Sequence, residues 1–367
     1  MSVKRVAIIT GGGDCPGLNA VIRAVVLTGK ERYGWEIFGV EDALSGLIDL
    51  DYRSPNGNRW LELRDVRGLL ARGGTMLGTS NRSDPFRFVV KEEDGTERET
   101  DVSDIVMQNY RDLELDALIS IGGDGSMAIA AKFLDKGMNI VGVPKTIDND
   151  LGSTDQTFGF DTAIGIATEA LDRIRDTADS HDRVMLVEVM GRHAGWIALH
   201  AGIAGGADAI LLPEIPYRVQ AIADMIKTRR AKGKNYSVIV VAEGAKPAGG
   251  EVSVMKAELG AMPRLIGAAH RVAAALDELV DADMRVTVLG HIQRGGSPST
   301  FDRVLATRYG VAAAELVDSE DFGKMVALRA DQIVTVDLRD AVAAPKLVDP
   351  DAQIVRQARQ LGVSFGE

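Results

Sequence analysis

The sequence predicts an α/β fold with largely parallel sheets, divided into two domains. Short apolar runs typical of buried strands alternate along the chain with segments of helical periodicity, as expected for strand–helix–strand units around parallel sheets. Two of these strands run directly into glycine-rich turns that open a helix. A chain of 367 residues also exceeds what one compact core usually holds, so two closely joined domains are expected.

The first strand–turn–helix unit covers residues 3–30. A buried-type strand at 3–10 leads into Gly-Gly-Gly-Asp-Cys-Pro-Gly at 11–17, and a helical pattern follows at 18–30. Glycines let backbone N–H groups approach an anion, and a helix N-terminus adds partial positive charge, so this turn is suited to cradle a phosphate. It matches neither the dinucleotide fingerprint nor the Walker motif, and an ordinary tight turn is the alternative.

A second glycine-rich segment at 72–82 follows a predicted strand at 35–40 and carries two arginines. Arg82, at its end, is either a solvated loop charge or, beside a phosphate site, a group that neutralises a phosphoryl group in transfer. The charge-dense stretch at 91–100 predicts a surface loop or hairpin.

The strand predicted at 115–121 ends in Gly-Gly-Asp-Gly-Ser at 122–126, and a helical pattern follows at 127–134. A second strand–glycine–helix unit in the first half favours a phosphate site over coincidence. Asp124, presented among glycines, is suited to hold Mg²⁺ through one carboxylate while phosphates supply other ligands. The alternative is that Asp124 caps the helix that follows.

The most polar cluster follows a short apolar strand. Pro144 cannot donate into a sheet ladder and should end that strand, which delivers Lys-Thr-Ile-Asp-Asn-Asp at 145–150 to the rim where open parallel sheets bind ligands. Thr146, Asp148 and Asp150 face one way if the backbone stays extended, and such a polar face is able to hold a hydroxyl and take its proton. An isolated Asp-Asn-Asp would instead indicate a turn.

The second half repeats the alternation of strands and helices. Strands are predicted at 184–189, 209–212, 237–241 and 285–289, and helices from 161 to about 178, after 190–196, at 304–317 and at 350–361. Arg183 and Arg192 bracket the first of these strands with positive charge. His291 and Arg294 are three residues apart between glycines, close enough to converge on one anion, whereas a surface turn with incidental charges is the weaker alternative. Nothing in the tail suggests chemistry.

The composition, with 46% hydrophobic and 26% charged residues, is globular. A net charge of −11 argues against non-specific nucleic-acid binding but leaves an anionic substrate to local arginines. The single Cys15 excludes an intramolecular disulfide and indicates a small residue in a tight turn. Neither a signal peptide nor an apolar run of membrane-spanning length is recognisable, so a cytoplasmic protein is expected.

Together, five motifs resemble the phosphofructokinase family, whose members phosphorylate fructose 6-phosphate at its 1-hydroxyl. They are Gly-Gly-Gly-Asp-Cys-Pro-Gly-Leu-Asn-Ala at 11–20, Gly-Gly-Asp-Gly-Ser at 122–126, Pro-Lys-Thr-Ile-Asp-Asn-Asp at 144–150, Met-Gly-Arg-His-Ala-Gly at 190–195 and Gly-His-Ile-Gln-Arg-Gly-Gly at 290–296. The resemblance covers nearly the whole chain. It implies two Rossmann-like three-layer α/β/α domains with the active site in the cleft between them: 1–159 plus 293–345 for the phosphoryl donor, and 160–292 plus 346–367 for fructose 6-phosphate.

The resemblance also implies roles for individual residues. Asp148 is expected to be the general base that takes the proton of the sugar's 1-hydroxyl, acting with Thr146, Arg82 and Arg192, and Asp124 is expected to hold Mg²⁺. The implied donor-binding residues are Gly12, Gly13, Arg82, Gly123, Asp124, Gly125, Ser126 and Lys145. The implied sugar-binding residues are Thr146, Asp148, Asp150, Met190, Gly191, Arg192, Glu243, His291 and Arg294, together with Arg183 and Arg285 supplied by a neighbouring subunit. A homotetramer with shared active sites and no nucleic-acid or membrane partner is therefore expected.

The phosphoryl donor is the open question within the resemblance. Members that use pyrophosphate are similar to one another in having Asp after Gly-Gly-Asp and Lys before Thr-Ile-Asp, whereas typical bacterial ATP enzymes have glycine at both places. This chain is mixed, with Gly125 at the first place and Lys145 at the second. Because glycine leaves room for an α-phosphate that a carboxylate would crowd and repel, ATP is the expected donor and pyrophosphate the alternative.

Two other functions compete with this one. NAD kinases and diacylglycerol kinases also use Gly-Gly-Asp-Gly, but they lack a sugar-phosphate pocket that matches His-Ile-Gln-Arg at 291–294. A sugar-phosphate-binding regulatory subunit without turnover would be expected to have lost its base or its metal ligand. Asp148 and Asp124 are both present, so the phosphofructokinase reaction is the expectation.

Overall fold

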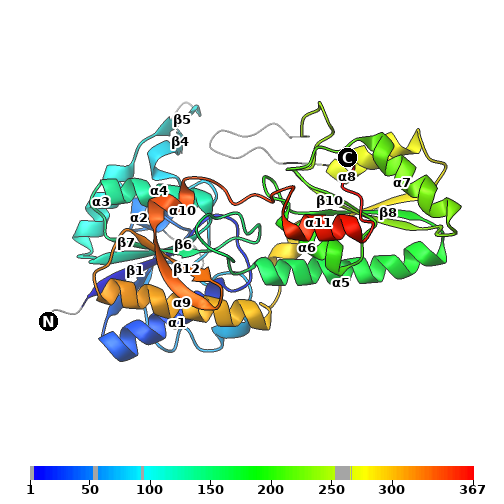
Figure 1. Ribbon diagram of the computed structural model, residues 1–367. Helices are drawn as coiled ribbons and strands as arrows, with labels where there is room; N and C mark the ends of the chain where they lie inside the picture. The colour runs from blue at the N-terminus through cyan, green and yellow to red at the C-terminus, as the bar shows by residue number, and fades with distance from the viewer. Residues whose placement is uncertain (1–3, 53–56, 92–94, 253–264, 266) are drawn as a thin grey trace.

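The computed structural model describes residues 4–52, 57–91, 95–252, 265 and 267–367, arranged as two lobes that each surround a sheet (Figure 1). The first lobe has a seven-stranded sheet with the order β13-β12-β7-β6-β1-β2-β3. Its strands are β1 (Arg5–Thr10), β2 (Glu36–Gly39), β3 (Arg59–Leu61), β6 (Ala117–Gly122), β7 (Ile140–Pro144), β12 (Lys324–Arg329) and β13 (Gln332–Asp337). Neighbouring strands are parallel except at the two edges, where β3 and β13 are antiparallel.

Helices cover both faces of this sheet because alternate strand residues point to opposite sides. Val6 and Ile8 of β1 share a core with α1 (Leu18–Leu27) and α9 (Thr300–Asp318). Ala7 and Ile9 share another core with residues of α2 (Ser45–Ile48), α3 (Ser103–Asp112), α4 (Asp124–Asp135) and α10 (Leu338–Val342). Smaller elements are the π-helical η1 (Thr28–Arg32), the 3₁₀ turns η2 (Leu69–Ala71) and η3 (Pro85–Arg87), and a hairpin of β4 (Phe88–Lys91) and β5 (Glu97–Thr100).

The second lobe has a four-stranded, fully parallel sheet with the order β11-β8-β10-β9. Its strands are β8 (Val184–Val189), β9 (Ala209–Leu211), β10 (Ser237–Ala242) and β11 (Met284–Val288). Met185 and Val187 pack with α5 (Phe160–Ser180) and α6 (Trp196–Ala204), whereas Val184 and Leu186 pack with α7 (Val219–Ala231) and α8 (Ala268–Asp277). The remaining elements are η4 (Gly290–Arg294), which follows β11, and α11 (Gln353–Gln360).

One apolar core continues through both lobes. It joins residues of α1 and α9 to residues of α5 and α6, and it includes Cys15 and Phe158, both fully buried. Helices α5 and α9 begin beside one another, since the Ser299 hydroxyl donates to the Asp161 carboxylate at 2.6 Å. Burial raises the pKa of the Cys15 thiol to about 12, which supports a packing role for this residue.

The predicted α/β class with largely parallel sheets is confirmed. The strands expected at 3–10, 115–121 and 184–189 appear as β1, β6 and β8, and the stretch at 91–100 contributes to the hairpin of β4 and β5. Sequence reasoning missed β3 and the pair β12–β13, together with α3, α7 and α8. The edge strands β3 and β13 have exposed and half-buried positions, so they lack the apolar run that marks a central strand. None of the helices in the described residues combines the length and apolarity needed to cross a bilayer.

Candidate active site

The first glycine turn, residues 11–17, lies between β1 and α1 and holds a neighbouring loop against itself. The Gly12 N–H donates to the Ser80 carbonyl at 3.3 Å, and the Thr79 hydroxyl donates to the Gly12 carbonyl at 2.5 Å. Gly12 has a φ of 76°, a backbone conformation that favours glycine. These contacts bring the exposed Arg82, which follows closely in the same loop, to the side of the turn.

The second glycine turn, residues 122–126, joins β6 to α4 and lies against the first. Strands β1 and β6 are parallel neighbours, and the Gly11 N–H donates to the Ile121 carbonyl at 2.9 Å. A methyl group at Gly11 would lie 2.6 Å from the Ser126 hydroxyl oxygen, so the first turn must begin with a residue that has no side chain. The two turns therefore form one surface at the carboxyl ends of adjacent strands, where parallel sheets bind ligands.

Asp124 and Gly125 open helix α4 at this surface. The N-cap is Gly123, which forms no side-chain capping hydrogen bond, so Asp124 is not the cap that the alternative interpretation required. Both Asp124 and Gly125 are exposed. A methyl group at Gly125 would meet no heavy atom within 4 Å, so open space borders the start of the helix.

The acidic loop, residues 145–150, leaves the sheet next to the second glycine turn. Strand β7 ends at Pro144, as predicted, and the Lys145 N–H donates to the Gly122 carbonyl at 2.9 Å. The buried Lys145 ammonium donates to the carbonyl of Gly13. The acidic loop is therefore in direct contact with both glycine turns.

The acidic loop bends instead of staying extended. Asn149 has a φ of 52°, and its side-chain oxygen accepts from the Thr157 N–H at 3.0 Å. The Thr146 hydroxyl oxygen accepts from the Asp148 N–H at 3.1 Å, and the Thr157 hydroxyl donates to the Thr146 carbonyl at 2.7 Å. These hydrogen bonds, and not the alternation of an extended strand, orient Asp148 and Asp150.

Burial changes the acidity of both carboxylates in this loop. Desolvation raises the pKa of Asp148 to about 6, against the opposing positive charge of Arg294. Desolvation and the charge of Asp148 raise the pKa of Asp150 to about 7. Among the described residues, neither Oδ1 atom has a hydrogen-bond partner, although both atoms are buried. A buried carboxylate with a pKa near 6 is suited to take a proton from a bound hydroxyl at neutral pH.

Loops of the second lobe approach the acidic loop from the carboxyl ends of β8 and β10. The Glu243 N–H donates to the Val189 carbonyl at 2.9 Å, and the Gly244 N–H donates to the Gly191 carbonyl at 3.1 Å. A side chain at Gly244 would collide with the Arg192 carbonyl. The two loops are therefore packed together, with burial raising the pKa of Glu243 and the charge of Arg192 lowering it.

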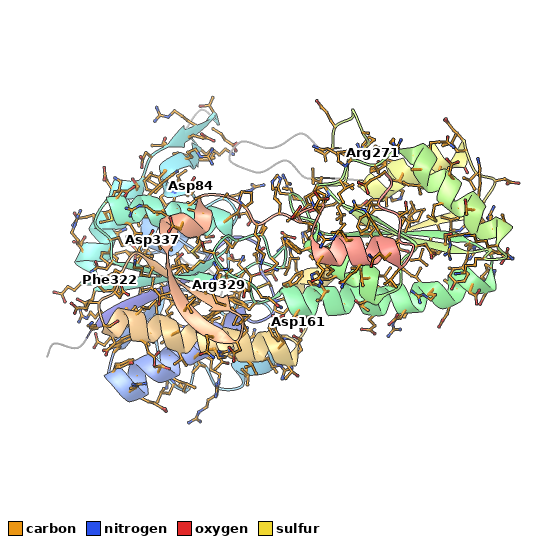
Figure 2. All side chains as sticks on the ribbon, viewed as in Figure 1. Asp84, Asp161, Arg271, Phe322, Arg329 and Asp337 are labelled. Atoms are coloured by element: carbon orange, nitrogen blue, oxygen red, sulfur yellow. The ribbon has the colours of Figure 1, made fainter. Side chains whose placement is uncertain are left out.

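Arg294 joins the two lobes. It ends η4, and its Nη1 donates to the Asp14 carbonyl in the first glycine turn at 3.2 Å. Its charge also lowers the pKa of both Asp148 and Glu243. His291 lies exposed on the same short helix. Figure 2 shows side chains of both lobes meeting in the region between them.

Most of the residues singled out in the sequence thus fall on two facing sets of loops. The first lobe supplies Gly12, Gly13, Arg82, Gly123, Asp124, Gly125, Ser126, Lys145, Thr146, Asp148 and Asp150, and the second supplies Met190, Gly191, Arg192, Glu243, His291 and Arg294. The two sets are joined by the hydrogen bond from Arg294 to Asp14 and by the charges that act on Asp148.

Arg183 and Arg285 lie away from this cluster. They stand near the amino ends of β8 and β11, where both form ion pairs with Asp283, that of Arg183 at 2.7 Å. Strand β8 has six residues and begins directly after Arg183, so about 20 Å of extended chain separates Arg183 from Val189, where the loop begins. Within one chain, these two arginines do not reach the other predicted site residues.

Asp124 is the predicted metal ligand, and its surroundings bear on that prediction. In the part of the chain that the structure describes, no three His, Cys, Asp or Glu side chains converge as a ready-made metal centre. Mg²⁺ that binds with a polyphosphate needs only one or two protein carboxylates, since phosphates and water complete its shell. An exposed carboxylate at the mouth of a glycine-lined surface fits this requirement.

Comparison with known proteins settles the family. The sequence model described as Phosphofructokinase matches residues 5–317. The chain belongs to the phosphofructokinase family. This agrees with the resemblance seen in the five motifs and places both glycine turns, the acidic loop and η4 inside the matched region.

Three members of the phosphofructokinase family illustrate the similarity. The ATP-dependent 6-phosphofructokinase 2 of Clostridium perfringens is 50% identical over 368 residues, covering 100% of this chain and 99% of that protein. The pyrophosphate–fructose 6-phosphate 1-phosphotransferase of Amycolatopsis methanolica is 50% identical over 349 residues, covering 95% and 97%. The crystal structure of Pichia pastoris phosphofructokinase in the T-state overlaps with a TM-score of 0.79 at 33% identity, covering 94% of this chain but 36% of that longer one.

Sequence reasoning missed two contacts made by residues outside the five motifs. Glu188 interrupts an apolar strand, and its carboxylate accepts from the Ala269 N–H at 2.8 Å at the start of α8. An acid inside an apolar run was a visible signal of such a role. Lys346 gave no comparable signal: its N–H donates to the Asp150 carbonyl at 2.8 Å, from a tail that was expected to contribute no chemistry.

Proposed function

We propose that the chain is an ATP-dependent 6-phosphofructokinase, which transfers the γ-phosphoryl group of ATP to the 1-hydroxyl of fructose 6-phosphate in glycolysis. The observation that carries this proposal is the position of Asp148. Its loop touches both glycine turns, and its carboxylate is within electrostatic reach of Arg294 and Glu243 from the other lobe. A carboxylate between a phosphate cradle and a basic pocket is the arrangement that phosphoryl transfer to an alcohol needs.

In this reaction Asp148 accepts the proton of the 1-hydroxyl as that oxygen attacks the γ-phosphorus. Thr146 fixes the turn through its hydrogen bond from the Asp148 N–H. Arg82 and Arg192 neutralise charge on the transferred group, because phosphoryl transfer depends chiefly on positioning and electrostatics. Bound Mg²⁺ would neutralise charge on the donor phosphates, with Asp124 as its protein ligand.

The space around Gly125 favours ATP over pyrophosphate. No atom would meet a methyl group there, so an α-phosphate has room beside the helix start. Lys145 contacts the first glycine turn and is able to serve either donor. The Clostridium and Amycolatopsis relatives are equally identical to this chain and are named for different donors. Overall identity therefore carries less weight here than the residue at position 125.

Steady-state assays of the purified protein with ATP and with pyrophosphate, at matched Mg²⁺, test the donor directly. We expect fructose 1,6-bisphosphate to form with ATP. Turnover with pyrophosphate alone would contradict ATP and support a pyrophosphate-dependent fructose 6-phosphate 1-phosphotransferase instead. No product with either donor, under conditions where the protein is folded, would overturn the proposed reaction.

The sugar phosphate is assigned to the loops of the second lobe, with Arg183 and Arg285 supplied by a neighbouring subunit. Their distance from Arg192 within one chain supports this assignment. Strand β11 is an edge strand with one neighbour, and Val288 at its end is 47% exposed while Ile292 is 66% exposed. Exposed apolar side chains beside an unpaired strand edge favour association with another protein surface, and a second copy of the chain in a homotetramer would bury them.

Mixing two inactive variants tests the shared site. Asp148→Asn and Arg183→Ala chains should each form nearly inactive oligomers, whereas their hybrids should regain activity because one kind of interface site then has both groups intact. Activity is measured after joint refolding or coexpression. As a control, Asp148→Asn with Arg82→Ala should not complement, since both residues belong to the same half-site. A mixture no more active than its components would contradict the shared site.

The proposed domain boundaries follow the same division of labour. Residues 1–159 with 293–345 would bind the donor, and residues 160–292 with 346–367 would bind the sugar phosphate. The first group contains all strands of the seven-stranded sheet, and the second contains all strands of the four-stranded sheet. As a glycolytic enzyme, the protein is proposed to act in the cytoplasm.

A further inference from the structure

The strap, residues 343–350, joins α10 in the first lobe to α11 in the second and crosses between the lobes (Figure 1). At its middle, the Lys346 N–H donates to the Asp150 carbonyl at 2.8 Å. The Lys346 carbonyl accepts from the Trp196 indole N–H at 2.8 Å, at the first residue of α6. One residue of the strap therefore connects the acidic loop to the helix that follows Arg192.

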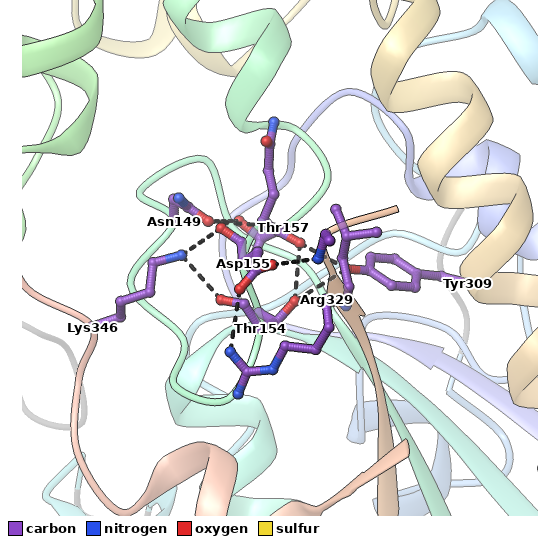
Figure 3. A network of polar contacts seen from close by, with 10 residues as sticks. Asn149, Thr154, Asp155, Thr157, Tyr309, Arg329 and Lys346 are labelled. Atoms are coloured by element: carbon purple, nitrogen blue, oxygen red, sulfur yellow. Dashed lines mark hydrogen bonds and ion pairs between the residues drawn. The ribbon is translucent and has the colours of Figure 1, made fainter. Parts of the chain in front are cut away.

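The Lys346 side chain strengthens this connection (Figure 3). Its ammonium donates to the Thr154 carbonyl at 3.0 Å and to the Asp155 carbonyl at 2.6 Å. The ammonium also lies 5.6 Å from the centre of the Trp196 ring. Charge-assisted hydrogen bonds to two successive carbonyls restrict the backbone more than neutral contacts do. Cation–π contact with Trp196 adds to the restraint from the second lobe.

The opposite side of the 154–156 segment is fixed by the first lobe. The Leu328 N–H of β12 donates to the Thr154 hydroxyl oxygen at 3.0 Å, and the Tyr309 hydroxyl of α9 donates to the Gln156 carbonyl at 2.7 Å. Arg329 pairs with the Asp155 carboxylate at 3.2 Å. Lys346 is thus the side chain through which the strap and α6 act on a segment that is otherwise held by β12 and α9 (Figure 3).

We propose that Lys346 is a positioning residue for phosphoryl transfer: its ammonium fixes residues 154 and 155, which lead into Thr157 and its hydrogen bonds to the acidic loop, so that Asp148 stays in place relative to Arg192 and faces the sugar hydroxyl. The inference rests on the proposed function. Misplacement of a reacting group by about 1 Å can cost on the order of 10²-fold in rate, so a tether on the loop that carries the base affects the chemical step. The Lys346 side chain contacts Thr154, Asp155 and Trp196, none of which belongs to the predicted donor or sugar site, so substrate binding should change little in a side-chain substitution.

The charge of Lys346 is sensitive to pH. Burial lowers its pKa to about 8, against the attraction of Asp155 and Asp150, while Arg329 lowers the pKa further. Burial, together with the charge of Lys346, lowers the pKa of the neighbouring His200 of α6. Above about pH 8 the ammonium gives up one proton and becomes a neutral amine, which loses the charge that strengthens both hydrogen bonds and the contact with Trp196. Activity should therefore decline on the alkaline side.

Three proteins test the inference: the wild type, Lys346→Met and Lys346→Arg, with Lys324→Met as a control because Lys324 pairs weakly with Asp337 at 3.8 Å on a distant strand. We expect Lys346→Met to lower kcat roughly ten-fold, with KM values within about three-fold, as for an interaction that matters in the transition state. The wild type should lose kcat above about pH 8, and Lys346→Arg, which stays charged, should keep kcat to higher pH.

The outcomes separate this inference from the proposed function. A wild type without turnover would overturn the proposed function. An active wild type whose kcat and alkaline profile are unchanged in Lys346→Met would overturn the role of Lys346. If Lys346→Met does not fold, the comparison of pH profiles between wild type and Lys346→Arg decides, because equal alkaline limbs contradict a role for the ammonium. Lys324→Met should match the wild type in every measurement.

Discussion

Replacing Asp148 by Asn is expected to lower kcat by about 10²–10⁴-fold with fructose 6-phosphate binding largely kept, because general-base loss removes proton transfer but not the shape of the site. Asn has the size of Asp and preserves the hydrogen bond from its N–H to Thr146. Initial rates at saturating ATP and varied fructose 6-phosphate measure both quantities. The control is Asp135→Asn, which removes an exposed carboxylate at the end of α4 that pairs with Arg339 of α10, and it should leave kcat unchanged.

Two further measurements sharpen this prediction. Wild-type kcat/KM should fall as the pH is lowered through about 6, because burial raises the pKa of Asp148 to about 6 and the protonated acid cannot accept a proton. The free energy of unfolding should change in the opposite direction and decrease as the pH rises through this range, because a carboxyl whose pKa is raised in the folded state binds protons more tightly there than in the unfolded chain. Asp148→Asn should therefore unfold at an equal or higher temperature at pH 8. Near-normal turnover in a folded Asp148→Asn protein would refute the assignment of the base.

Replacing Gly125 by Asp is expected to lower kcat/KM for ATP by about 10²-fold, while pyrophosphate turnover falls less or rises. The new carboxylate would enter open space beside Asp124, where it adds negative charge against donor phosphates; two unit charges about 4 Å apart repel by about 4 kcal/mol near a protein surface. The measurement is kcat/KM for each donor at fixed Mg²⁺.

Two controls separate volume from charge at this position. Gly125→Ala should be close to neutral, because its methyl group would meet no atom within 4 Å and alanine suits a helix better than glycine. Gly125→Asn has the size of Asp without its charge and should lie between the two. If Gly125→Asp retains full ATP activity, position 125 does not govern donor choice.

The glycine turns and the acidic loop were predictable because each follows a buried strand directly, and the carboxyl ends of parallel strands share one edge. Gly122 and Lys145 illustrate this, since their contact is a continuation of the ladder between β6 and β7. The bend at Asn149 was not predictable, because it depends on a hydrogen bond to Thr157 that only the folded loop provides.

Long-range relationships were beyond the reach of local patterns. Arg183 and Arg192 flank the same strand and so lie at its opposite ends, but local patterns do not show which distant residues each arginine meets there, such as Asp283 beside Arg183. The contact between Lys346 and Asp150 joins parts of the chain that no periodicity links. Such residues come into contact only when the two lobes pack around their common core.

The continuous core has a mechanical consequence. Cys15 and Phe158 lie in apolar packing shared by α1, α9, α5 and α6. A hinge motion that separated the two lobes would expose that packing to water. Adjustments to arriving or departing molecules must instead take the form of small sliding displacements along well-fitted helix surfaces. The shared core therefore favours small displacements over wide opening of the two lobes.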